Sequence, residues 1–115
     1  MFRRPREKME WHLEFIRSLP CVVCDDNTST EAAHLRAPNL EYGKGETGMG
    51  TKPDDLWVLP LCSAHHRKQH EGNEAKFWHK VGIDPWRLAL SLFAATGSPE
   101  LAQEVIERQV KSRWD

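Results

Sequence analysis

Residues 59–70 read LPLCSAHHRKQH, and the expected fold is built around this stretch. It holds one of the three cysteines and three of the six histidines of the chain. Cys62 and His65 are spaced as C-x-x-H, while His66 and His70 are spaced i and i+4, on one face of a predicted helix. Two metal-binding sets therefore overlap in one turn and helix. The first is suited to a structural ion, and the second is open enough for chemistry.

A second cysteine motif lies upstream, at Cys21-Val-Val-Cys24. Together with Cys62 and His65 it gives the ligand types and spacing of a closed, four-ligand zinc site. Such a site would supply folding free energy to a chain that buries only a modest core. A redox role for Cys21 and Cys24 is the alternative, but no βαβ pattern surrounds them.

The composition is that of an ordinary globular protein. The 115 residues are 39% hydrophobic and 29% charged, with a net charge of −1, and we expect one domain over residues 1–115. No apolar run reaches the ~18 residues of a membrane span, so we expect no membrane helix, no signal peptide and no membrane partner. Cysteines that bind zinc rather than form disulfides indicate a reducing environment, so we expect a cytoplasmic location. The small net charge argues against coating nucleic acid through bulk charge, although local patches can bind phosphates.

Two short strands and a series of helices are predicted to carry these motifs. Residues 30–35 (TEAAHL) and 56–61 (LWVLPL) are typical of a hairpin, in which the first strand presents His34. Start and stop signals predict helices over residues 9–19, 63–70, 73–82, 84–97 and from 98 toward the end of the chain. His12 and His79 lie on such helices without matching ligands, so we expect core-edge or surface roles for both.

Residues 36–55 contain four of the seven glycines and are predicted to form a flexible loop. The glycine backbone of this loop could approach a phosphate closely. The basic arm over residues 1–8 could also contact a phosphate backbone, through its charged side chains. A plain surface loop and a solvated terminus are the alternatives.

Together these residues resemble the HNH group of His-Me finger nucleases over residues 20–72. In that group a ββα unit holds one catalytic metal, and paired cysteine motifs often hold a zinc beside it. The tract GMGTKPDDLWVLPLCSAHHRKQH, following EAAHL, further resembles the phage-associated HNH proteins related to RecA-dependent nucleases. The resemblance implies an α+β fold: a small ββα-metal core with a structural zinc, flanked by a helix over residues 9–19 and by C-terminal helices over residues 73–113.

By this resemblance, His34 corresponds to the general base, and His66 and His70 to ligands of a catalytic divalent ion, Mg²⁺ or Mn²⁺. A neutral imidazole can accept a proton from water near neutral pH, and the ion can offset charge on a phosphodiester. The implied activity is metal-dependent hydrolysis of DNA. A recombinase filament or another phage or host DNA-processing protein is the implied partner. Candidate phosphate contacts are Lys52, Arg67 and Lys68.

The chain departs from the family pattern at two positions. The asparagine expected ahead of the PLC tract is missing, with Trp57 near its place and Asp54 and Asp55 just upstream as supporting residues for the ion. Ala33 precedes His34 where many relatives have Asp or His, which removes one metal ligand. A zinc-stabilised module that binds nucleic acid or protein without catalysis is therefore the alternative function, and the number of metal ions bound would distinguish the two.

Overall fold

The structure is a computed structural model that describes residues 8–45 and 54–114, with side chains up to Gln109. Within this part the chain forms an α+β fold of five α-helices and one two-stranded sheet, as the sequence predicts. The elements in chain order are α1 (Glu10–Arg17), β1 (Thr30–His34), the 3-10 helix η1 (Leu40–Tyr42), β2 (Val58–Cys62), α2 (Ser63–His70), α3 (Glu74–Val81), α4 (Pro85–Ala94) and α5 (Pro99–Trp114).

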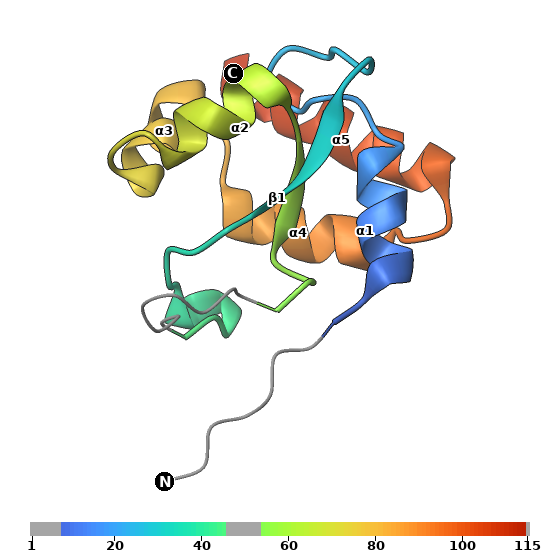
Figure 1. The fold of residues 1–115 in the computed structure, drawn as a ribbon, viewed down its shortest axis with the longest axis horizontal. Helices are drawn as coiled ribbons and strands as arrows, with labels where there is room; N and C mark the ends of the chain where they lie inside the picture. Colours follow the sequence, from blue (N-terminus) through green and yellow to red (C-terminus); the bar gives the residue numbers. More distant parts are fainter. Residues whose placement is uncertain (1–7, 46–53, 115) are drawn as a thin grey trace, which may run out of the picture.

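The hairpin of β1 and β2 lies at the centre of the molecule (Figure 1). The strands are antiparallel, with Thr30 opposite Cys62 and His34 opposite Val58. Helices α1 and α4 pack against the hairpin, α5 packs against α4, and α2 follows β2 without an intervening loop. Every residue of β2 is buried, including Pro60. A proline is tolerated there because in a two-stranded sheet each strand has an edge that needs no donor to the ladder.

Apolar side chains from four of the helices and both strands form one core. Its most deeply buried members include Ile16 on α1, Leu61 on β2, Trp78 on α3 and Leu92 on α4. Truncating such a residue to alanine typically costs ~2–5 kcal/mol. This core fixes α1 and the hairpin, and so positions the motifs they carry.

The predicted starts of α3, α4 and α5 are confirmed by their caps. A side-chain oxygen at each N-cap accepts a backbone N–H three residues later, at Asn73 (3.1 Å), Asp84 (3.2 Å) and Ser98 (3.3 Å). Gly82 ends α3 with a φ of 76°, a left-handed conformation that glycine adopts without steric cost. Local sequence signals therefore set where these helices begin.

Two predictions for the stretch between β1 and β2 need correction. The second strand begins at Val58 rather than at residue 56, because residues 54–57 form a turn closed by the Trp57 N–H on the Asp54 carbonyl (3.1 Å). The loop predicted as flexible is structured over residues 36–45: it contains η1, and the buried Lys44 donates through Nζ to the Arg36 carbonyl (2.9 Å). Its remainder over residues 46–53, with Lys52, lies outside the described residues.

Helix α2 has no apolar face. Of its eight residues only Gln69 is buried, and Gln69 Nε2 donates to Glu74 Oε2 on α3 (3.0 Å). The Glu74 carboxylate also accepts the backbone N–H groups of Arg36 (3.0 Å) and Ala37 (2.8 Å) beyond the end of β1. Polar contacts, rather than buried hydrocarbon, therefore hold α2 against its neighbours.

Within the described residues, none of the helices has the length and apolar character needed to cross a membrane.

Candidate functional site

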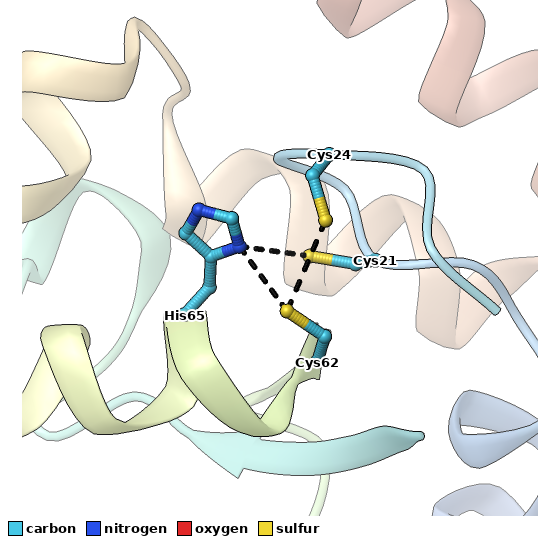
Figure 2. A group of neighbouring side chains, drawn as sticks. All are labelled: Cys21, Cys24, Cys62 and His65. Carbon is cyan, nitrogen blue, oxygen red and sulfur yellow. Dashed lines mark hydrogen bonds between the residues drawn. The ribbon is translucent and has the colours of Figure 1, made fainter. Parts of the chain in front are cut away.

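Four metal-ligand side chains from two distant parts of the chain converge beside the sheet (Figure 2). Cys21 and Cys24 lie in the turn after α1, Cys62 ends β2, and His65 lies in the first turn of α2. Their ligand atoms are all within 4.8 Å of one another. Cys24 Sγ lies 3.8 Å from Cys62 Sγ, and His65 Nδ1 lies 3.2 Å from Cys62 Sγ and 3.7 Å from Cys21 Sγ.

The geometry of this Cys3His cluster fits a tetrahedral ion. With Zn–S near 2.3 Å and Zn–N near 2.0–2.1 Å, tetrahedral angles separate neighbouring donors by about 3.5–3.8 Å. The three separations given above, 3.2, 3.7 and 3.8 Å, are close to this range, and three cysteines with one histidine are a common structural zinc set. The cluster could therefore hold a metal ion such as zinc, with all four positions filled by the protein.

Backbone contacts of the Cys21–Cys24 turn shape the cluster. The Cys21 N–H donates to the Asp26 carbonyl (2.9 Å), and the Asp25 N–H donates to the Cys21 carbonyl (2.8 Å). Asp25 has a φ of 65°, a left-handed conformation that Asp tolerates better than most residues. The Val22 N–H donates to the Pro60 carbonyl (3.1 Å), which docks the turn onto β2.

The cysteines of the cluster differ in acidity. Cys24 is exposed as a residue, but desolvation of its thiol raises its pKa to about 11, and the neighbouring Cys21 thiol adds to the effect. Burial also opposes ionisation of Cys62, but the N–H groups of His65 and Ala64 at the start of α2 stabilise its thiolate, and its pKa lies below the ordinary value. Since metal ligation requires thiolates, binding at this cluster must release protons.

A second group of residues, which we call the histidine pocket, lines an open pocket of about 640 Å³. It brings together His34 from β1 with His66 and His70 from α2, the three histidines predicted for catalysis. The other lining residues are Lys8, Glu10, Leu13, Arg17, Ala32, Arg36 and Asp55.

His66 and His70 face each other through their Nε2 atoms, which are 3.1 Å apart. His66 Nδ1 lies 2.7 Å from Glu31 Oε1, and the other oxygen of Glu31 accepts the Ser63 hydroxyl (3.1 Å). Because a carboxylate accepts and does not donate, His66 carries its proton at Nδ1 when neutral, with its lone pair at Nε2. Two adjacent ligands of an octahedral ion at ~2.1 Å are about 3 Å apart. The pair could therefore offer two adjacent ligands, with Glu31 holding one ring in place.

Two pKa shifts are consistent with this arrangement. The hydrogen bond from His66 holds the pKa of Glu31 below its ordinary value, so Glu31 is ionised near neutral pH. Burial lowers the pKa of His70, and the neighbouring His66 lowers it further. At neutral pH His70 is therefore uncharged, the form that binds metal.

His34 is paired with an aspartate. Its Nε2 lies 2.8 Å from Asp55 Oδ1, and Asp55 Oδ2 accepts the backbone N–H of Met9 (2.8 Å) just before α1. Of the two predicted supporting residues, Asp55 lines the histidine pocket and Asp54 does not. Trp57, which stands near the place of the missing asparagine, is buried in the core.

Two of the three predicted phosphate contacts, Arg67 and Lys68, lie outside the histidine pocket, and Lys52 is not among the described residues. Arg67 and Lys68 are exposed on α2. The basic residues that do line it are Lys8, Arg17 and Arg36, with Arg17 paired to Glu10 (3.0 Å).

Two residues at or next to the histidine pocket were missed from the sequence, Arg36, which lines it, and Glu31, which contacts His66. Arg36 follows His34 by two residues, the spacing that keeps side chains on one face of an extended chain. Glu31 is the acidic residue of the TEAAHL segment. Lys8 belongs to the basic arm that the sequence does single out.

The fold and these two sites define an α+β protein with a Cys3His cluster beside a histidine pocket. Residues 1–95 match the family described as a protein of unknown function, DUF968, and the chain belongs to this family. It is also 37% identical over 80 residues to the uncharacterized protein YdfU of Escherichia coli K12. That match covers 70% of this chain but 21% of the relative, so the chain spans about a fifth of the length of YdfU. No solved structure matches the chain.

Proposed function

We propose that this chain is a metal-dependent DNA endonuclease of the HNH type. The observation that carries the proposal is the meeting of His34, on β1, with His66 and His70, on α2, in one open pocket. The order hairpin then helix, with the Cys3His cluster at their junction, supports a ββα-metal core over residues 20–72. The three histidines come from the elements that carry base and ligands in such a core.

His34 is the general base. The ionised Asp55 accepts from Nε2–H, so the lone pair of the neutral ring is at Nδ1, and Nδ1 takes the proton of the attacking water. An imidazole ordinarily titrates close to neutrality, so a base of this type in an open pocket can work at physiological pH.

His66 and His70 would hold the catalytic divalent ion, Mg²⁺ or Mn²⁺, through their Nε2 atoms. When bound there, such an ion supplies charge stabilisation for the scissile phosphate and for the departing 3′ oxygen. Glu31 orients His66 by accepting its Nδ1–H. Because the 3′ oxygen is the leaving group, the products have 5′-phosphate and 3′-hydroxyl ends.

The rim of the pocket is suited to a DNA strand. Lys8, Arg17 and Arg36 are the basic residues that line it, and cationic side chains position a phosphate backbone without reading its sequence. We propose that they contact the phosphates on either side of the scissile bond. A recombinase filament that presents such a strand is a partner consistent with this role.

Plasmid cleavage with and without Mg²⁺ or Mn²⁺ tests the proposal. His34→Ala should lower the rate by about 10²–10⁴-fold, because it removes the base, while zinc content and DNA affinity stay unchanged. His79→Ala is the matched control, since His79 is exposed on α3 and does not line the pocket. A wild-type protein that cuts no DNA with any divalent ion, even with a recombinase filament present, would contradict the proposal.

A binding module without catalysis is the second candidate. It is favoured by a groove of about 500 Å³ next to the Cys3His cluster, between α2 and α3, whose lining includes Lys68, Lys76 and Lys80. In that case one metal ion would bind per chain, at the cluster. Titration of zinc-loaded protein with Mn²⁺ separates the two, because the nuclease binds a second ion at His66 and His70.

A further inference from the structure

Asp55 lies in an unusual position for a charged residue. Its relative exposure is 2%, and each of its two oxygens takes a hydrogen bond of 2.8 Å, one with His34 Nε2 and one from the Met9 N–H. A buried carboxylate is costly unless its oxygens are satisfied, so these bonds are needed for it to be there at all. The Met9 N–H belongs to the backbone ahead of α1 and cannot rotate away. The carboxylate is thereby held in one orientation.

We infer that Asp55 is a positioning residue: it fixes His34 in the tautomer that carries its proton on Nε2 and its lone pair on Nδ1. The role of Asp55 in catalysis rests on the proposed function, but the tautomer of His34 does not depend on that function. The sequence predicts Asp55 as a supporting residue for the divalent ion. The geometry instead assigns it to the base, since one oxygen faces His34 and the other faces backbone.

The same contacts predict the effect of replacing the Asp55 carboxylate with an amide. In Asp55→Asn the Met9 N–H still requires an oxygen, so the amide oxygen turns to Met9 and the NH2 group turns to His34. An NH2 group only donates, so His34 Nε2 must accept and the ring proton moves to Nδ1. The ring keeps its place but no longer has a lone pair at Nδ1. In serine proteases, a tautomer change of this kind lowers kcat by ~10⁴.

Nitrogen NMR of ¹⁵N-histidine-labelled, zinc-loaded protein, without DNA or a second metal, tests the tautomer directly. Wild-type His34 should show the Nε2–H pattern, and Asp55→Asn should show the Nδ1–H pattern. Glu14→Gln removes an exposed carboxylate from α1 and should leave the wild-type pattern. A wild-type His34 protonated on Nδ1 overturns the inference even if Asp55→Asn fails to fold.

Cleavage kinetics add the functional readout. Asp55→Asn should lower kcat by about 10²–10⁴-fold, while the KM for DNA and the half-activating Mg²⁺ concentration stay within a factor of about two. A tenfold rise in half-activating Mg²⁺ with an unchanged His34 tautomer would instead make Asp55 a metal ligand and overturn the inference. If the tautomer reverses as expected but the wild-type protein cuts no DNA, the positioning role stands and the nuclease proposal fails.

Discussion

Helix α2 contributes His65 to the Cys3His cluster and the next residue, His66, to the histidine pocket, yet the two sites are built differently. In the cluster four donor atoms face one another within 4.8 Å, and they would fill every position of a tetrahedral ion. In the pocket the histidines are held by carboxylates, His66 by Glu31 and His34 by Asp55, and the space around them is open. A closed set stabilises the fold, whereas an open set leaves positions for water and substrate.

The largest expected effect comes from breaking the cluster. Cys62→Ser removes one of four ligands, and we expect the domain to unfold at 25 °C. Structural zinc contributes ~10–16 kcal/mol of apparent binding free energy, as much as the ~5–15 kcal/mol stability of a typical domain. Circular dichroism and metal analysis measure both consequences. Wild-type protein should retain one zinc ion through mild chelation, and a Cys62→Ser protein with a native melting curve would contradict the assignment.

Breaking the pocket should spare the fold. His66→Ala or His70→Ala deletes a proposed ligand, and we expect the half-activating Mg²⁺ or Mn²⁺ concentration to rise at least about 10-fold. Glu31→Gln should produce a smaller rise in the same direction, because Gln can still accept from His66 but carries no charge. Zinc content and the melting curve are the controls. Loss of zinc in His66→Ala would show that the two sites are not independent.

Neutralising basic residues one at a time compares the contribution to DNA binding of those that line the histidine pocket with that of exposed residues on α2 outside it. Arg36→Gln or Lys8→Gln should weaken DNA binding and reduce the slope of log K against log salt by about 0.7–0.9 for each phosphate that is no longer neutralised. Arg67→Gln and Lys68→Gln, on the exposed surface of α2 outside the pocket, should leave that slope unchanged. Fluorescence anisotropy at several salt concentrations measures it. A larger decrease in the slope for Lys68→Gln would indicate that DNA binds in the groove between α2 and α3 instead.

The smallest effect concerns His12, which is fully buried and hydrogen-bonded through Nδ1 to Thr96 Oγ1 (2.7 Å). Burial lowers the pKa of His12, against the opposing charge of Asp55. The unfolded state therefore binds this proton more readily, so stability is full above the unfolded pKa of ~6.5 and falls as the pH drops toward the folded value.

His12→Phe should remove this contribution, since a phenyl ring does not titrate. The wild type should lose unfolding free energy relative to the variant on going from pH 7.5 to pH 5.5, by at most ~1.4 kcal/mol per pH unit. Urea denaturation at the two values measures it. His79→Gln, on the exposed surface of α3, should follow the wild-type curve, and an unchanged difference for His12→Phe would rule out this role.

Much of the framework could be predicted because its signals are local. The bounds of α2 and the caps at Asn73, Asp84 and Ser98 depend on residues a few positions apart. The convergence of Cys21 and Cys24 with Cys62 and His65 was predictable as well, since ligand type and spacing report a common ion.

The partners of the histidines proposed for catalysis could not be found in this way. Asp55 reaches His34 because residues 54–57 form a turn, and sequence alone did not reveal that turn. Glu31 meets His66 across 35 positions of chain, through the register of the hairpin and the start of α2. Lys44 falls in the loop predicted as flexible, yet it is buried against the Arg36 carbonyl. Each of these contacts is set by tertiary packing and not by a local pattern.

Because α2 has no apolar face, its positions should differ sharply from one another in the substitutions that they tolerate. Only Gln69 of α2 is buried, so no side chain of the helix is constrained by the shape of the hydrophobic core. Substitutions at exposed positions such as Ala64 and Lys68 should be close to neutral, whereas His65, His66, Gln69 and His70 should tolerate almost none. In a deep mutational scan α2 should therefore show constraint residue by residue, set by chemistry. The core residues Val58, Leu59 and Leu61 of β2 should instead accept many residues of similar volume.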